Sequence, residues 1–257
     1  MKKDPYSKRS HLLALFFRYT GLVLVLLSFS DFFFLDITGC FLGTEIFGTL
    51  AVLFLIIAAG LYMILLSGRL DAPSAKEILA DDPRPPVLYL RSFGSDRSWG
   101  TPSGIELQMR FELSVIGPVV AIGRPGDVLP IIGVPRKFLK DDDNWEDYVK
   151  EWMSRAALVV FRVGTSSGLC LEMMMAFKNL APKQIVIIIP GKKAWKEFLG
   201  WANDTLPVIL PEHTGNACLL LFDDDWHPKL IYHPFSQKDK EWYEYHEVWN
   251  PITERFK

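Results

Sequence analysis

The sequence predicts an α/β domain with a doubly wound parallel sheet, preceded by a two-helix hairpin that spans a membrane. Two long apolar runs, residues 12–35 and 47–66, predict the hairpin, because a helix needs about 20 apolar residues to cross the hydrocarbon core. In the rest of the chain, short β-rich apolar runs alternate with helical patterns, which is typical of a parallel sheet. The 257-residue chain leaves about 185 residues for this domain, enough for a substantial core.

The charges around the two apolar runs predict their orientation. Residues 36–46, which connect the runs, contain no Lys or Arg, whereas basic residues flank the outer ends. These are Lys2, Lys3, Lys8 and Arg9 before the first run and Arg69, Lys76 and Arg84 after the second. By the positive-inside rule both termini are cytoplasmic. We therefore expect an integral protein of the inner or plasma membrane that contacts the lipid bilayer. The first run exceeds the length of a signal-peptide core, which favours a retained anchor.

Proline content and polarity predict the domain boundaries. Residues 1–11 form a cytoplasmic N-terminus, residues 12–66 form the hairpin, and the proline-rich segment 67–86 reads as a linker with a short helix at 75–80. The α/β domain then covers residues 87–235. Residues 236–257 form a C-terminal helical tail.

The predicted strands are apolar runs without clean alternation, as expected for strands that are buried on both faces. They cover residues 87–90, 119–122, 158–163 and 185–189. Apolar residues at helical spacing predict helices over residues 144–157, 169–180 and 193–202. Residues 105–115 fit both a strand and a helix, because apolar residues alternate and also share one helical face. The surrounding β-α-β rhythm favours the helix.

Parallel sheets bind ligands at the carboxyl ends of their strands, so the loops after the predicted strands hold the candidate site. The first loop contains Arg91 and Ser92, which offer a cation and a hydroxyl. The second contains Arg124 between glycines, where it can meet a phosphate bidentately. The alternative for Arg124 is a solvated side chain in an ordinary tight turn.

The third loop leads from a strand into a helix and carries Ser166 and Ser167, with Glu172 in the first or second helical turn. Amides at a helix N-terminus and two hydroxyls can hold an anion. A carboxylate beside them can stabilise positive charge on a sugar during cleavage of its glycosidic bond. The alternative for Glu172 is an acidic residue that balances the helix dipole.

Several function classes lack support in the sequence. The net charge of −2 gives no indication of nucleic-acid binding. The three cysteines and five histidines show no metal-ligand spacing. No glycine-rich phosphate loop, dinucleotide fingerprint or nucleophile elbow occurs. We therefore predict no metal site and no resident cofactor.

Residues from about Pro86 to Pro190 resemble Toll/interleukin-1 receptor (TIR)-like domains. The resemblance rests on four segments, Val87–Asp96, Gly117–Gly126, Trp145–Val163 and Ser167–Glu172. It implies a flavodoxin-like fold. Enzymatic members of that family hydrolyse NAD at the nicotinamide–ribose bond, and others are assembly modules. Glu172 takes the place of their catalytic glutamate. The spacing of Gly168, Glu172 and Ala176 is also similar to nucleoside deoxyribosyltransferases, whose glutamate attacks C1′.

The resemblance implies a membrane-anchored cytoplasmic TIR-like domain that binds a nicotinamide or related nucleotide and hydrolyses its N-glycosidic bond in bacterial signalling or defence. NAD would be a substrate and not a cofactor. In this interpretation Glu172 is catalytic, and the ligand is held by Arg91, Ser92, Arg124, Ser166 and Ser167. Self-association in the membrane is expected. The alternative is a non-enzymatic, membrane-anchored interaction or oligomerisation module.

Overall fold

The computed structural model describes residues 9–37, 45–70, 75–92, 104–123, 134–137, 145–212, 215–233 and 246–257. The chain divides into two compact units, Met1–Ala72 and Pro73–Lys257. The first unit contains the predicted hairpin and the second contains the predicted α/β domain, so the boundary falls inside the predicted linker.

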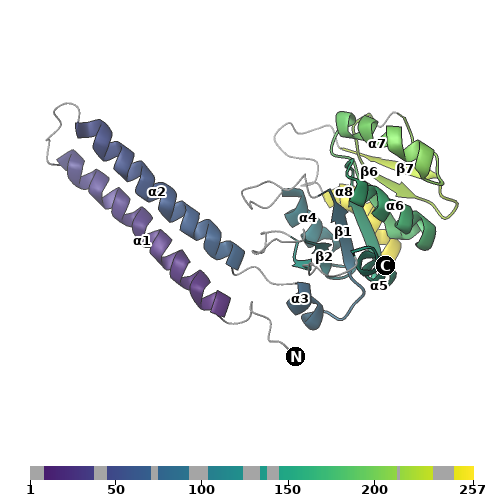
Figure 1. The fold of residues 1–257 in the computed structure, drawn as a ribbon, viewed down its shortest axis with the longest axis horizontal. Coiled ribbons are helices and arrows are strands. Elements are labelled where there is room, and N and C mark those ends of the chain that lie inside the picture. Colours follow the sequence, from purple (N-terminus) through teal and green to yellow (C-terminus); the bar gives the residue numbers. More distant parts are fainter. Residues whose placement is uncertain are drawn as a thin grey trace. The chain divides into compact units, whose positions relative to one another are not determined.

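The first unit consists of two helices, α1 (Arg9–Ile37) and α2 (Glu45–Leu70), that run side by side in opposite directions (Figure 1). Their backbones approach each other closely at Gly21 and Gly60. A Cβ atom on Gly21 would lie 2.6 Å from the carbonyl oxygen of Gly60, and one on Gly60 would lie 2.9 Å from that of Gly21. Ala14 and Ser67, one heptad away on either helix, are also buried. Small residues therefore form the seam between the helices.

The outer surface of this hairpin is apolar. The exposed large side chains are Leu13, Phe16, Tyr19, Leu22, Val23, Leu26 and Leu27 on α1 and Val52, Phe54, Leu55, Leu61, Tyr62 and Leu65 on α2. The sequence prediction of two helices is confirmed. In the part of the chain that the structure describes, no helix meets the combined length and apolarity of a membrane span.

The second unit contains a seven-stranded sheet with the order β3-β2-β1-β4-β5-β6-β7. The strands are β1 (Val87–Arg91), β2 (Val119–Ile122), β3 (Arg136–Lys137), β4 (Leu158–Arg162), β5 (Ile185–Ile188), β6 (Ala217–Phe222) and β7 (Pro228–Tyr232). Strands β3, β2, β1, β4 and β5 are mutually parallel. This α/β architecture is compatible with a flavodoxin-like fold.

The expectation of an entirely parallel sheet is wrong at one side, because β6 and β7 are antiparallel to their neighbours. The short connection between β6 and β7 explains the direction of β7, since parallel strands need a longer crossover. The carboxylate of Asp223 accepts hydrogen bonds from the amides of Asp225 and His227 and fixes this turn. The acidic run at residues 223–225 is therefore a hairpin turn.

Helices cover both faces of the sheet, so the doubly wound arrangement is confirmed. The helices are α3 (Ala75–Asp81), α4 (Gly104–Leu113), α5 (Trp145–Arg155), α6 (Ser167–Asn179), α7 (Lys192–Thr205) and α8 (His246–Thr253), with 3-10 turns at Pro182–Gln184 and Glu254–Phe256. Apolar residues of α5, α6 and α7 pack on one face, and those of α4 and α8 pack on the other. The helix α8 lies within the predicted tail at residues 236–257, of which residues 236–245 lie outside the described residues.

The alternation of side chains in β1 shows how the sheet faces both layers. Leu88 and Leu90 join the core under α5, α6 and α7, whereas Val87 and Tyr89 join the core under α4 and α8. All five residues of β1 are buried. This two-sided burial is what the absence of a polar alternation in the sequence predicted.

The ambiguous segment at residues 105–115 is mainly helical, as the β-α-β rhythm indicated. Ile105, Met109 and Leu113 of α4 are buried against the sheet, whereas Leu107 and Phe111 are exposed. The alternating pattern arose because apolar residues lie on two opposite sides of one helix. The strand interpretation fails for this reason.

Arg84 connects the segment after α3 to the C-terminal end of α4. Its guanidinium donates hydrogen bonds to the carbonyl oxygens of Ser114 and Val115, both at 2.9 Å, and pairs with Asp82 at 2.6 Å. Carbonyls at a helix C-terminus have no intrahelical donor. A cation at that position also suits the helix dipole.

Two glycine substitutions test the packing of the second unit. A Cβ on Gly117 would collide with the carbonyl oxygen of Pro85, whereas one on Gly200, inside α7, would meet nothing within 4 Å. We expect Gly117→Ala to destabilise the protein by about 2 kcal/mol or more. The matched Gly200→Ala should stabilise it by about 0.5–1 kcal/mol. Thermal unfolding of the full chain in detergent measures both, and equal effects would contradict the packing described.

Candidate functional site

The strand order places a topological switch between β1 and β4. From β1 the chain continues to β2 on one side, and it later returns to β4 on the other side of β1. In open α/β sheets the crevice at such a point, at the carboxyl ends of the strands, is where ligands bind. The last residues of β1 and β4 are Arg91 and Arg162. Charged residues thus end two strands that are otherwise apolar.

Arg91 is held inside the protein by an ion pair. Its side chain is 1% exposed, and its Nε lies 3.4 Å from the Oε1 of Glu106 on α4, whose side chain is 6% exposed. The guanidinium carbon also lies 5.4 Å from the centre of the Tyr89 ring. Two buried ions tolerate removal from water only as a well-placed pair. Arg91 is therefore paired with a carboxylate inside the protein. The sequence analysis did not predict this ion pair.

Arg162 lies beside Arg91. The two residues are register partners in the parallel pair β1–β4, so their side chains lie on the same face of the sheet. Arg162 is partly exposed. Like charges on neighbouring strands repel each other, and an ion pair at this edge joins Glu106 to Arg91. Two neighbouring guanidiniums at the carboxyl ends of the strands suit an anion.

Glu172 lies in the second turn of α6 and is 4% exposed. Among the described residues, none donates a hydrogen bond to its carboxyl group. Burial raises the pKa of Glu172 to about 8, and the nearby Arg91 opposes this increase only in part. The carboxyl is consequently protonated for the most part at neutral pH. The structure brings Glu172 into electrostatic contact with Arg91, and Glu172 does not face solvent.

The first and third predicted loops meet at this edge. A Cβ on Gly164 would lie 3.0 Å from the Cβ of Ser92, so the backbone after β4 passes directly against the residue after β1. The hydroxyl of Ser166 caps α6 by accepting a hydrogen bond from the Leu169 amide at 3.4 Å. Ser166 thus has a structural role in this conformation, whereas Ser167 is exposed at the first turn.

Arg124, the remaining predicted ligand residue, lies outside the described residues. Glu106 and Arg162 were missed by the sequence analysis. Glu106 shares the buried side of α4 with Ile105 and Met109, so a helical projection of that segment would have placed a carboxylate in the core. Arg162 is a charged residue at the end of an apolar strand, in the same position as Arg91.

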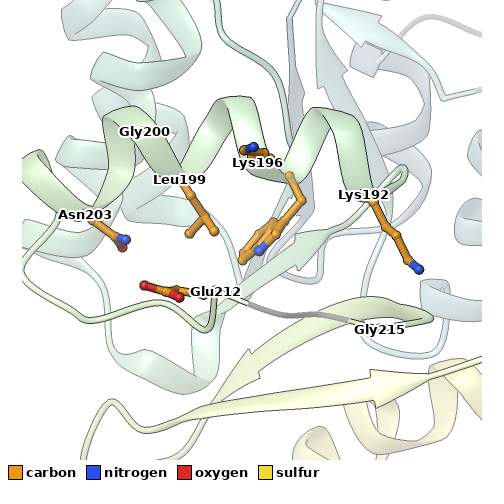
Figure 2. Close-up of a pocket in the computed structure, with 8 residues that line it drawn as sticks. Lys192, Lys196, Leu199, Gly200, Asn203, Glu212 and Gly215 are labelled. Carbon is orange, nitrogen blue, oxygen red and sulfur yellow. The ribbon is translucent and has the colours of Figure 1, made fainter.

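A separate cavity of about 680 Å³ lies along α7 (Figure 2). Its lining residues are Lys192, Trp195, Lys196, Leu199, Gly200, Asn203, Glu212 and Gly215. Figure 2 shows Lys192 and Asn203 toward opposite ends of this stretch of α7, with Glu212 on the segment that follows the helix. The indole of Trp195 is fixed by a 3.0 Å hydrogen bond to the Pro211 carbonyl oxygen. None of the predicted site residues lines this cavity.

The chain was compared with known protein families, with curated proteins and with solved structures, and no match was found in any of the three. The site is therefore defined by its own geometry. It combines two neighbouring arginines, one carboxylate that pairs with a cation, and one buried carboxyl without a hydrogen-bond donor among the described residues. Such perturbed groups at a strand edge are typical of functional sites.

The buried carboxyl of Glu172 should make the stability of the protein depend on pH. Its pKa is raised from an ordinary 4.5 to about 8, so the folded state keeps a proton that the unfolded chain releases. Stability therefore falls as the pH rises between these values and levels off above about 8. We expect Glu172→Gln to remove this slope and to stabilise the protein at pH 7 by about 1–3 kcal/mol.

Denaturant unfolding of the full chain across this pH range measures the effect of Glu172→Gln. Glu151→Gln is the control, because the Glu151 side chain is 62% exposed and surface ion pairs contribute little. A parallel pH slope in the wild type and in Glu172→Gln would show that the carboxyl is already ionised at neutral pH.

Proposed function

We propose that this chain is a membrane-anchored, TIR-like protein that binds a nicotinamide or related nucleotide and hydrolyses its N-glycosidic bond. The observation that carries the proposal is the buried Glu172 carboxyl near Arg91, at the switch point of the sheet. Sugar–base bonds break through states with positive charge on the sugar. A carboxylate in a water-poor position stabilises such charge more strongly than one in solvent.

The positive edge supports a nucleotide as the ligand. Arg91 and Arg162 supply two cations on neighbouring strands, and Glu106 pairs with Arg91. The N-terminal turn of α6, which begins at Ser167, adds amide groups and the positive end of a helix dipole. A nucleotide phosphate would complement these groups, with Ser92 and Ser167 as hydroxyls on the adjoining segments.

The proposed reaction balances as a hydrolysis. Water adds to C1′ of the ribose, and the bond between C1′ and the pyridinium nitrogen breaks. Nicotinamide leaves as a neutral molecule with both electrons of that bond, and one proton is released to solvent. The ionised form of Glu172 stabilises the cationic ribose, so only the deprotonated fraction of the protein is active.

Nicotinamide release from NAD should increase with pH. With a pKa of about 8 for Glu172, roughly one-tenth of the carboxyl groups are ionised at pH 7, and most are ionised above about pH 9. We expect the rate to rise nearly tenfold over this range and then to level off. Nicotinamide release by the full chain in lipid nanodiscs, followed by chromatography, measures it.

Glu172→Gln should abolish this release at every pH, because the amide has nearly the same shape and cannot ionise. Glu112→Gln provides a matched control, since Glu112 is another buried glutamate, on α4, that pairs with His246. A folded wild type that releases no base from NAD or related nucleotides at any pH would contradict the enzymatic proposal.

The hairpin is proposed to be the membrane anchor. Its support is the combination of a seam of small residues, at Gly21 and Gly60, with large apolar side chains on the outside. Close backbone packing through small residues is the usual way in which helices associate in lipid. In water, an exposed apolar surface of this extent would favour aggregation. The basic flanks place both termini on the cytoplasmic side in this proposal.

Charges on the outer surface of α2 test the anchor. Leu55 and Leu61 are 66% and 51% exposed near the middle of the helix, and an arginine there costs roughly 2.5–3.5 kcal/mol for insertion. We expect the wild type to stay in membranes after alkaline extraction and Leu55→Arg/Leu61→Arg to be lost from them. Phe111→Arg, at a site 68% exposed on α4, should behave like the wild type. Extraction of the wild type itself would contradict the anchor.

A second candidate function is a membrane-anchored interaction module. The observation that favours it is an exposed apolar stripe on and just after α4, formed by Leu107, Phe111 and Val115 at 44%, 68% and 64% exposure. Such a stripe on a helix that already covers the sheet is typical of an interaction surface. A chain that self-associates through this stripe, loses association in Phe111→Glu and releases no base would support this function.

A further inference from the structure

We propose that Glu106 is a positioning residue that holds the Arg91 guanidinium in an ion pair and thereby weakens the attraction between Arg91 and an ionised Glu172 in the resting protein. This inference rests on the proposed function for the role of Glu172. It assigns a distinct role to a residue on α4 that neither the resemblance nor the sequence pattern indicated. The consequence is that Glu106 sets the pH at which the site becomes active.

The geometry of the ion pair carries the argument. Arg91 Nε and Glu106 Oε1 lie 3.4 Å apart, and their side chains are 1% and 6% exposed. Because both side chains are almost inaccessible to solvent, the attraction between the two charges is little screened. Arg91 therefore attracts the carboxylate form of Glu172 less than an unpaired guanidinium in the same place would.

Arg91 and its charged neighbours lie on three elements other than α6. Arg91 from β1 is the described cation that acts on Glu172. Glu106 from α4 pairs with Arg91, and Arg162 from β4 is the register partner of Arg91. From α5, the helix that packs beside α6, no described charged group acts on Glu172. Among the described charged groups, Arg91 therefore connects Glu106 to Glu172.

Burial explains why the weakened attraction to Arg91 matters. A carboxylate that loses water without gaining a donor or a cation becomes protonated instead. Glu172 is 4% exposed, and no described residue donates a hydrogen bond to it. Burial accordingly raises the pKa of Glu172 to about 8. The resting site thus holds a neutral carboxyl, an arginine paired with Glu106 and the partly exposed Arg162.

The test is to replace Glu106 with Gln in the full chain. Without its carboxylate partner, Arg91 should stabilise the ionised form of Glu172. We expect the midpoint of Glu172 ionisation to fall by about one pH unit or more. Nicotinamide release at pH 7 should then rise about fivefold, because the ionised fraction increases from about one-tenth to about one-half.

The ionisation itself is measured by infrared spectroscopy. The carbonyl band of the protonated Glu172 carboxyl is identified by its loss in Glu172→Gln and followed against pH. This measurement needs no activity. A downward shift of the midpoint in Glu106→Gln together with absent base release would therefore support the role of Glu106 and reject the proposed hydrolysis. Base release with an unchanged midpoint would support the proposed hydrolysis and reject the role of Glu106.

Glu112→Gln is the matched control, because Glu112 lies on the same helix and is buried to a similar extent, at 5% exposure against 4% for Glu106. Glu112 pairs with His246 and accepts a hydrogen bond from Gln108. It does not pair with Arg91. We expect no change in the Glu172 midpoint in this variant. An equal shift in Glu112→Gln, or an upward shift in Glu106→Gln, would overturn the inference.

A second variant serves if Glu106→Gln does not fold. Glu106→Asp keeps the charge but withdraws it from Arg91 by one methylene group, so a smaller downward shift of the midpoint is expected. Arg91→Gln removes the cation and should therefore raise the midpoint of Glu172 ionisation. A downward shift in Arg91→Gln would show that the guanidinium does not carry the coupling.

Discussion

A guanidinium buried at the end of a central strand is the constraint on which the arrangement of the site depends. Arg91 follows four buried residues of β1 and has almost no access to water. A cation in that position requires a carboxylate within contact distance, and the fold supplies Glu106 from the helix that covers the same face. The ion pair and the burial of Ile105, Met109 and Leu113 require the same rotation of α4 about its axis. The same rotation turns Leu107 and Phe111 outward.

Strands β1 and β4 carry charge only at their carboxyl ends. In β1 and β4 all residues before the terminal arginines are buried and apolar, on both faces. Charged groups of these two strands are thus confined to the carboxyl ends, where Arg91 and Arg162 are register partners and Arg91 acts on Glu172. Glu172 comes from the helix over one face and Glu106 from the helix over the other. Arg91 therefore interacts with carboxyl groups from both helical layers.

Much of the fold could be predicted from the sequence, because strands buried on both faces appear as unbroken apolar runs. The four predicted strands and the helices after them are present, and Arg91 and Glu172 lie at the same edge because each follows a strand of that sheet. The predictions failed for the direction of a strand and for the rotation of a helix about its axis. Nothing in the apolar run of β6 indicates that it runs antiparallel to β5. The dual periodicity of residues 105–115 concealed Glu106, because the helix register that buries it was ambiguous. The environment of Arg124 lies outside the described residues.

The contacts of Arg84 connect the segment after α3 to the body of the domain. Its guanidinium bridges Asp82 and the carbonyl oxygen of Ser114, directly after α4, and the first turn of α4 carries Glu106. The helix that supplies the partner of Arg91 is thus held at its far end by the segment that precedes β1.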